Sequence, residues 1–317
     1  MEKVCLKETK KVTILVPCHN EEFSLPLLYE QLLVLMNGHT EYLWQILMVD
    51  DGSTDGTLDV MRTLHNRDDR MCYISLSRNF GKENAMLAGF DYAGGDCMVI
   101  MDADLQHPPS LVPDMLELWE EGYEDVYARR VTRGREPWWR RRLSLVYYSI
   151  LQRMSDVKIL ENVGDFRLLD RKCIDALRTM RETQRYTKGM FCWIGFRKKE
   201  IVFEQHDRVA GHSSWNLLKL FNLAVEGITS FTVAPLRISI VLGLVVSAAA
   251  IIYSIYFFVK TMFNGDPVQG FPTLIIVILF LGGMQLFSLG IIGEYLGRIF
   301  NETKNRPVYI ISEKVGV

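Results

Sequence analysis

The sequence predicts an α/β fold with a parallel sheet, followed by two long apolar helices. Two observations lead to this prediction. Apolar segments of strand length alternate with segments of helical periodicity up to residue 102, as is typical of βα units whose strands pair in parallel. Nearer the carboxyl end, the runs 238–259 and 271–293 contain no charged residue over 22 and 23 positions.

The expected strands end in polar or acidic residues. The first stops at Pro17 and leads into His19 and Glu21, and the second ends at Asp50 and Asp51. In open α/β sheets, ligands bind at the carboxyl ends of the strands, so these residues are candidates for one site. The expected strands cover residues 11–17, 44–50, 72–76 and 98–101, with helical periodicity over 25–35 and 82–92.

The fourth strand runs into Asp102 and Asp104, which are spaced i and i+2. Alternation along a strand places both carboxylates on one face. Such a pair holds a hard divalent cation when a substrate diphosphate completes the coordination shell. An isolated Asp-x-Asp is more often a solvated turn, but the neighbouring polar strand ends, the apolar runs and a basic segment favour the cation site. No glycine fingerprint of the dinucleotide or P-loop type is present.

Each uncharged run exceeds the roughly 20 residues that cross a hydrocarbon core of about 30 Å. The connector 260–270 is short and carries only Lys260 as a basic residue, whereas basic residues flank the outer ends of both runs. This asymmetry predicts a multi-pass protein of the cell membrane with both termini in the cytoplasm. Glu294 and Arg298 are expected to pair near the inner boundary. Glycines along the second run favour close helix contacts, and hence a homo-oligomer.

The segment 129–142 contains seven arginines and two adjacent tryptophans in a chain of net charge −2. No nucleic-acid-binding motif accompanies it, so a nucleic-acid partner is not expected. Basic residues beside tryptophan are typical of helices that lie on an anionic lipid bilayer. We therefore expect interfacial helices over about 139–155 and 215–230, with a solvated loop and an ordinary core helix as the alternative for the first.

The predicted organisation is a cytoplasmic catalytic domain over 1–236, two transmembrane helices within 237–298 and a cytoplasmic tail over 299–317. The six cysteines show no paired or zinc-type spacing, so free thiols are expected. The six histidines form no ligand cluster. His107 follows the acidic motif, and we expect it to serve in that loop rather than as a metal ligand.

Several motifs, which together extend over about residues 10–310, resemble family 2 glycosyltransferases with the GT-A fold. Within that family, the chain is similar to membrane-bound polyprenyl-phosphate glycosyltransferases, closest to bactoprenol glucosyltransferases. The matching motifs are Val16-Pro-Cys-His-Asn-Glu21, Val49-Asp-Asp-Gly-Ser-Thr-Asp-Gly-Thr57, Ser77-Arg-Asn-Phe-Gly-Lys82, Asp102-Ala-Asp-Leu-Gln-His-Pro-Pro109, Gly164-Asp-Phe-Arg-Leu168, Ala210-Gly-His-Ser-Ser-Trp215, Ala234-Pro-Leu-Arg237 and Gly293-Glu-Tyr-Leu-Gly-Arg298.

The resemblance implies a GT-A (Rossmann-like) catalytic domain and assigns roles to the strand-end residues. Asp102 and Asp104 would hold Mg²⁺ or Mn²⁺ against the diphosphate of a UDP-sugar. His19 stands where many relatives place tyrosine, at a position that would contact the nucleotide. The residues implied in nucleotide binding are Pro17, His19, Glu21, Asp50, Asp51, Asp102 and Gln106.

The resemblance also places Asp165 at the acceptor, together with Asp102 and Asp104 as catalytic residues. A phosphate monoester acceptor has a second pKa near 6 and scarcely needs a general base at neutral pH. Asp165 is therefore either a base for the minor monoanion or a group that positions the metal, acceptor or sugar. The candidates for binding acceptor or donor phosphates are Arg129, Arg185, Lys188, Arg208 and Ser213.

The implied reaction is an inverting transfer of a sugar from a UDP-sugar to undecaprenyl phosphate. Among the possible sugars, glucose is the one that we expect. The β-linked product would supply cell-surface glycan modification, and relatives suggest a tetramer. N-acetylglucosamine and galactose remain alternative sugars. A processive polysaccharide synthase is disfavoured because Gln184-Arg185-Tyr186 lacks the Gln-x-x-Arg-Trp motif. A non-catalytic lipid-sugar carrier or scaffold is the alternative of a different class.

Overall fold

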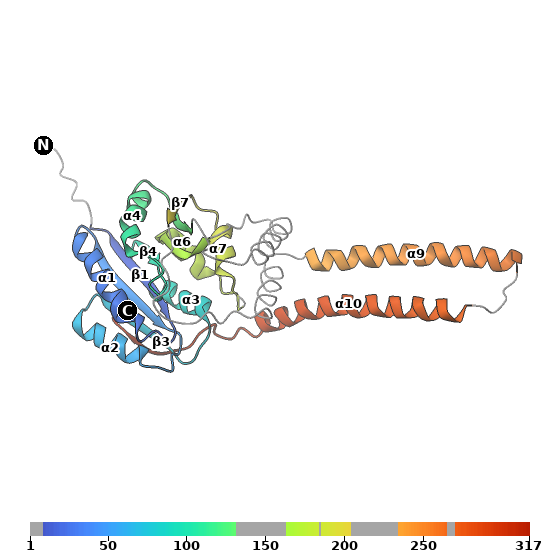
Figure 1. Ribbon diagram of the computed structural model, residues 1–317, viewed down its shortest axis with the longest axis horizontal. Coiled ribbons are helices and arrows are strands. Elements are labelled where there is room, and N and C mark those ends of the chain that lie inside the picture. Colours follow the sequence, from blue (N-terminus) through green and yellow to red (C-terminus); the bar gives the residue numbers. More distant parts are fainter. Residues whose placement is uncertain (1–8, 131–162, 184, 204–233, 265–269) are drawn as a thin grey trace. The chain divides into compact units, whose positions relative to one another are not determined.

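The computed structural model describes residues 9–130, 163–183, 185–203, 234–264 and 270–317 (Figure 1). The chain divides into two compact units. The first contains the sheet and includes residues 307–317, and the second contains the two long carboxyl-terminal helices. The expected interfacial helices over 139–155 and 215–230 lie outside the described residues, as do Arg208 and Ser213.

The four strands and the helices between them form as the periodicity predicts. β1 pairs in parallel with both β2 and β4, and β2 pairs in parallel with β3. Nearly every residue of these strands is buried, which explains why they appear as continuous apolar runs rather than alternating patterns. The elements are β1 (Lys11–Cys18), α1 (Ser24–Gly38), β2 (Leu43–Asp50), α2 (Thr57–Arg67), β3 (Met71–Leu76), α3 (Lys82–Tyr92) and β4 (Cys97–Ile100).

The complete sheet is mixed rather than wholly parallel, with the order β7-β5-β6-β4-β1-β2-β3-β8. β6 is antiparallel to β4 and β5, and β8 is antiparallel to β3. The parallel prediction therefore holds for β1 to β4, whereas β6 and β8 pair in antiparallel fashion with strands distant in sequence. β7 pairs in parallel with β5. The remaining elements are a 3-10 turn (Pro109–Leu111), α4 (Val112–Glu120), β5 (Asp125–Arg130), β6 (Val163–Asp170), α6 (Arg171–Thr179), α7 (Thr187–Trp193), β7 (Lys198–Phe203) and β8 (Ile311–Val315).

Helices cover both faces of the sheet. Ile14 and Val16 of β1 belong to the buried cluster that includes Leu28 of α1. Leu15 points to the opposite face, where α3 packs so closely that a Cβ at Gly89 would overlap the Leu15 side chain. Glycine at this position therefore allows α3 to lie against β1, and α3 begins at the edge of the sheet where the strands end.

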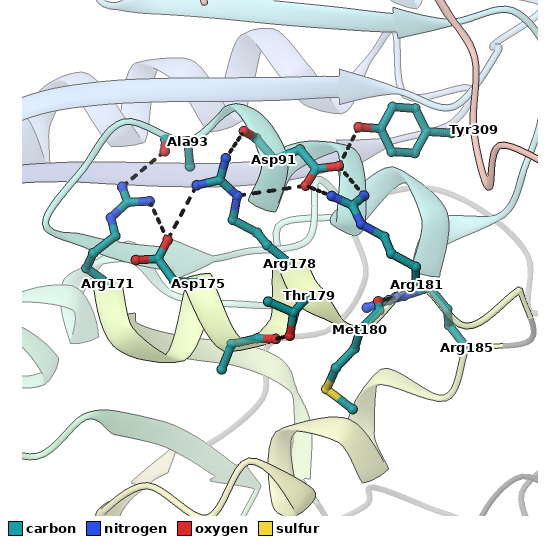
Figure 2. A network of polar contacts seen from close by, with 11 residues as sticks. Asp91, Ala93, Arg171, Asp175, Arg178, Thr179, Met180, Arg181, Arg185 and Tyr309 are labelled. Atoms are coloured by element: carbon teal, nitrogen blue, oxygen red, sulfur yellow. Dashed lines mark hydrogen bonds and ion pairs between the residues drawn. The ribbon is translucent and has the colours of Figure 1, made fainter.

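The end of the chain is anchored to the first unit. β8 pairs with the outer strand β3, and the Glu313 carboxylate accepts hydrogen bonds from Arg62 and Tyr73. Figure 2 shows the neighbouring contacts, in which the Asp91 carboxylate accepts hydrogen bonds from Arg181 at 2.6 and 2.7 Å and from the Tyr309 hydroxyl at 2.5 Å. Part of the segment 299–317, which was expected to be a tail, thus completes the sheet and covers an otherwise open strand edge.

Replacing Tyr309 by phenylalanine tests this anchor. Loss of the hydrogen bond to the Asp91 carboxylate is expected to lower the free energy of unfolding of the first unit by about 1.5 kcal/mol. The matched control is Tyr42→Phe, which removes a hydrogen bond to Glu120 at the surface and should cost less than about 0.5 kcal/mol. Thermal unfolding of both variants measures the difference, and equal losses would contradict an anchoring role for Tyr309.

The second unit is a hairpin of α9 (Ala234–Asn264) and α10 (Phe271–Thr303), which lie side by side (Figure 1). The uncharged runs 238–259 and 271–293 fall within these helices. The predicted pair near the end of α10 is confirmed, since Arg298 Nε lies 3.1 Å from Glu294 Oε1. Among the residues that the structure describes, no helix combines the length and the apolar character needed to cross a membrane.

Candidate active site

A cavity of about 330 Å³ opens where β1, β2 and β4 end. Six of the predicted nucleotide and metal residues line it, as expected from the meeting of parallel strand ends at one edge of a sheet. They are Pro17, His19, Glu21, Asp51, Asp102 and Asp104. The lining also includes residues to which the sequence assigned no role, namely Cys18, Asn79, Gly81, Lys82, Ala85 and Ala103.

Asp51 fixes the loop that leads into α3. Its two carboxylate oxygens accept hydrogen bonds from the backbone N–H groups of Phe80, at 2.7 Å, and Gly81, at 2.9 Å. Burial raises the pKa of Asp51, and the two N–H donors oppose this rise. Gly52 has φ +61°, and a Cβ there would lie 2.6 Å from the backbone nitrogen of Asn79. The close approach of the two loops therefore requires glycine at this position.

Asp50 and His19 occupy different positions relative to the cavity. Asp50 is only 2% exposed, accepts hydrogen bonds from Ser53 N and Ser75 Oγ, and is not part of the lining. Its contact with a nucleotide remains a prediction.

The His19 ring is held on both of its nitrogens. Nδ1 lies 3.0 Å from the Asp51 carbonyl oxygen, while Asn79 Nδ2 lies 3.1 Å from His19 Nε2. Because the carbonyl only accepts, Nδ1 is the donor and Nε2 accepts from Asn79.

The acidic motif forms a tight turn that rests on His107. The Asp102 backbone N–H donates to His107 Nδ1 at 3.1 Å, and the Gln106 N–H donates to Asp104 Oδ1 at 3.2 Å. The buried His107 ring stacks on Phe166, with ring centroids 4.8 Å apart. Burial lowers the pKa of His107, which favours the neutral ring that this bond requires. His107 thus has the loop role that the sequence predicted.

Two substitutions at His107 separate its hydrogen bond from its packing. His107→Phe keeps an aromatic ring on Phe166 but leaves the Asp102 N–H without its acceptor, an expected loss of about 1–3 kcal/mol of unfolding free energy. His107→Asn retains an acceptor but loses the stacking. Thermal unfolding, together with the rate of the sugar transfer that the sequence motifs imply, distinguishes them: we expect higher residual activity in His107→Asn. The reverse order would show that stacking, rather than the acceptor, holds the turn.

Lys82, the first residue of α3, joins the acidic motif to β6. Its Nζ lies 2.6 Å from Asp102 Oδ1 and 2.6 Å from Asp165 Oδ2. Burial alone would lower the pKa of Lys82, but the two carboxylates outweigh it and raise that pKa well above its usual value. Burial would likewise raise the pKa of Asp165, yet Lys82 and then Lys188 hold it well below the usual range. Asp165 is therefore a buried carboxylate whose ionised form the neighbouring cations favour.

Glu83 places a further cation near Asp165. Its Oε2 accepts the backbone N–H of Thr187 at 3.1 Å, where α7 begins. This bond positions the adjacent Lys188, whose charge lowers the pKa of Asp165. Burial, and then the nearby Asp165, raise the pKa of Glu83. Lys188 thus acts on Asp165 through its charge, whereas Glu83 is a positioning group that the sequence did not indicate.

Two of the other predicted phosphate ligands, Arg129 and Arg185, do not line the cavity. Arg129 forms a two-point contact with Glu200 at the surface, at 3.0 and 3.2 Å. Arg185 is only 5% exposed and donates to the Met180 carbonyl oxygen (Figure 2). Arg130, which had no assigned role, lies close to Gly164, and its buried Nε has no hydrogen-bond partner among the described residues. Alternation along β5 separates Arg129 from Arg130, and the arginine-rich sequence alone did not distinguish them.

The residues at the acidic turn fit a divalent cation. Carboxylate oxygens are hard ligands of the kind that Mg²⁺ and Mn²⁺ prefer. The position of the Lys82 ammonium, 2.6 Å from Asp102, shows that the site already accommodates a positive charge. Within the described parts of the chain, no group of three or more His, Cys, Asp or Glu side chains is arranged to hold a metal ion.

Comparison with known proteins gives the class and then the family. Residues 13–178 match the family model of glycosyl transferase family 2, and residues 234–299 match the GtrB C-terminal hairpin. Together with the mixed α/β sheet, these matches define the protein as a glycosyltransferase with a carboxyl-terminal hairpin. The chain belongs to glycosyl transferase family 2.

Similar proteins match almost the whole chain. An uncharacterized glycosyltransferase, sll0501 of Synechocystis, is 40% identical over 309 residues, covering 98% of this chain and 97% of its own. The bactoprenol glucosyl transferase of Shigella phage SfII is 39% identical over 303 residues, covering 96% of this chain and 98% of its own.

The solved glucosyl-3-phosphoglycerate synthase of Mycobacterium tuberculosis aligns with a TM-score of 0.46 and 15% identity over 69% of this chain and 78% of that one.

Proposed function

We propose that the protein transfers a sugar from a UDP-sugar to undecaprenyl phosphate, with inversion at the anomeric carbon. Glucose is the sugar that we propose. The observation that carries this proposal is the acidic cavity at the strand ends, lined by Asp102 and Asp104. The similarity to a bactoprenol glucosyl transferase over nearly the full chain supports the lipid acceptor. The product would be a β-linked lipid-phosphate sugar for cell-surface glycan modification.

The cavity suits the donor nucleotide. Its volume of about 330 Å³ falls within the range of about 300–1,000 Å³ that is typical of small-molecule sites. Pro17 and the His19 ring provide a wall for a flat base, and Glu21 and Asp51 provide acceptors for hydroxyl or imide hydrogens. In this arrangement the diphosphate lies toward Asp102 and Asp104.

A divalent cation, Mg²⁺ or Mn²⁺, would be held by Asp102 and Asp104, and it would neutralise the charge that develops on the leaving UDP. The turn that carries these residues is fixed by His107 and by the Gln106 N–H. The chain's own contribution is therefore to hold two carboxylates at fixed positions beside the nucleotide wall, so that the donor diphosphate completes the shell.

Asp165 acts in this proposal as a positioning group rather than as a base. Its depressed pKa makes it a poor proton acceptor, and a phosphate acceptor is already largely ionised at neutral pH. Oδ2 lies against Lys82, whereas the buried Oδ1 has no hydrogen-bond partner among the described residues. We assign this oxygen to a hydroxyl of the transferred sugar, which can donate a hydrogen bond to it.

The hairpin provides the membrane association in this proposal. The uncharged runs 238–259 and 271–293 and the match to a hairpin family support two crossings, with the catalytic domain and both termini in the cytoplasm. Lys188, near Asp165, would receive the lipid phosphate.

Labelling of single cysteines in intact cells tests the topology of the hairpin. One cysteine is placed in the connector 260–270 and another at the carboxyl end, and only the one in the connector should react from outside.

The test of the reaction uses detergent-purified protein, undecaprenyl phosphate and a panel of UDP-sugars with Mg²⁺ or Mn²⁺, with EDTA as control. We expect one preferred donor, release of UDP and complete loss of transfer in EDTA. Transfer in EDTA at the full rate would contradict the metal site. A folded protein that binds UDP but transfers no sugar would favour the non-catalytic carrier instead.

A further inference from the structure

The carboxylate proposed to hold the metal already has a cationic partner. Lys82 Nζ lies 2.6 Å from Asp102 Oδ1, which is within ordinary ion-pair distance. The Lys82 side chain lines the cavity and is 41% exposed there. A metal ion that uses the same oxygen of Asp102 would come so close to this ammonium that the two charges repel each other.

We propose that Lys82 and the divalent cation compete for Asp102, so that the metal binds the acidic turn only as the ammonium leaves it. This inference rests on the metal site of the proposed function. It adds a role for Lys82 as a positioning residue that holds Asp102 in place before the donor arrives.

The geometry provides Lys82 with an alternative partner after the exchange. Its second carboxylate contact, Asp165 Oδ2 at 2.6 Å, does not involve the acidic turn. Its backbone is also fixed, because the N–H of the preceding Gly81 donates to Asp51. The ammonium can therefore leave Asp102 by side-chain rotation alone, while α3 stays in place.

The exchange makes metal binding depend on the donor. A metal ion entering alone must displace the ammonium from Asp102 and then remain close to it. A donor diphosphate brings negative charge to the same cavity, which stabilises the released ammonium as well as the metal. We therefore expect the protein to bind the metal weakly alone and tightly together with the nucleotide.

The experiment measures Mn²⁺ binding to the full-length purified protein by electron paramagnetic resonance, without donor or acceptor. Lys82→Gln should bind Mn²⁺ about tenfold more tightly than the wild type, which corresponds to about 1.4 kcal/mol. Lys82→Arg, which keeps the charge, should remain within about twofold of the wild type. The matched control is Lys10→Gln, because Lys10 pairs with Glu120 at 3.1 Å on the surface and should have no effect.

A folded Lys82→Gln protein with unchanged or weaker Mn²⁺ binding would overturn the competition, as would equal tightening in Lys82→Arg. Such a result would leave the transfer reaction standing, because that reaction is measured separately with the wild type. Failure of sugar transfer in the wild type, with the tenfold difference in Mn²⁺ binding intact, would contradict the proposed function but not the competition.

A second measurement uses the wild type alone, in case Lys82→Gln does not fold. The rate at which an amine-reactive reagent labels Lys82, read by mass spectrometry relative to Lys10, should rise at least about threefold with saturating Mg²⁺. Release from Asp102 leaves the amine with one carboxylate contact instead of two, so the reagent reaches it more easily. An unchanged relative rate at saturating Mg²⁺ would overturn the proposal.

Discussion

Asp104→Asn is expected to reduce sugar transfer at least about a thousandfold, since a loss of roughly 4 kcal/mol of transition-state stabilisation has that effect. Asparagine removes the negative charge that holds the metal against the leaving diphosphate. The fold should survive, because an asparagine oxygen still accepts the Gln106 N–H that Asp104 Oδ1 accepts at 3.2 Å. Initial rates and thermal unfolding of the purified variant measure both effects.

The control for this substitution is Asp114→Asn, at an exposed position in the first turn of α4. It removes the same charge outside the cavity lining and should leave the transfer rate within about twofold of the wild type. An Asp104→Asn protein that transfers sugar at the wild-type rate would show that the acidic turn does not hold the catalytic metal.

Asp165→Asn is expected to lower the turnover number at least about a hundredfold, or roughly 2.7 kcal/mol, while UDP binding stays nearly unchanged. The substitution weakens the contact with Lys82 at 2.6 Å and removes the anionic oxygen proposed to orient the sugar. The cavity wall formed by Pro17 and His19 is separate from Asp165. Turnover numbers and UDP dissociation constants of the variant and the wild type measure the two effects.

The pH dependence tests whether Asp165 positions or accepts a proton. Because its pKa is held well below the usual range, it stays ionised throughout the neutral region. Activity should therefore fall only below about pH 6, where the acceptor phosphate gains a proton. The residual activity of Asp165→Asn should show the same acid limb. A variant whose activity requires a higher pH than the wild type would instead indicate that Asp165 is the base.

The four central strands were predictable because local periodicity encodes them. Each βα unit has its own apolar run and helical stripe, and the parallel order follows from their alternation. The same logic places Asp51, Asp102 and Asp104 in one cavity, since each follows a parallel strand. The antiparallel partners β6 and β8 were not predictable, because pairing with distant strands leaves no local pattern.

The side-chain partners at the site could not be predicted from the sequence either. Lys82 lies in the motif Ser77-Arg-Asn-Phe-Gly-Lys82, but only the folded sheet brings it to both Asp102 and Asp165. Arg129 and Arg130 are adjacent in an arginine-rich segment, and the register of β5 decides which one faces Glu200. Arg185 matched the expected charge for a phosphate ligand, yet it is buried against Met180. Charge and spacing indicate candidates, whereas the strand register selects among them.

The most direct test of the central claim follows the sugar into lipid. Purified protein in liposomes that contain undecaprenyl phosphate is incubated with UDP-[¹⁴C]glucose and Mn²⁺, and the organic phase is then extracted and analysed by mass spectrometry and proton NMR. We predict a β-linked undecaprenyl-phosphate glucose, formed with one UDP released per sugar and absent with undecaprenol as acceptor. Label that remains in water as free glucose, from a protein that binds UDP, would contradict transfer to a lipid phosphate.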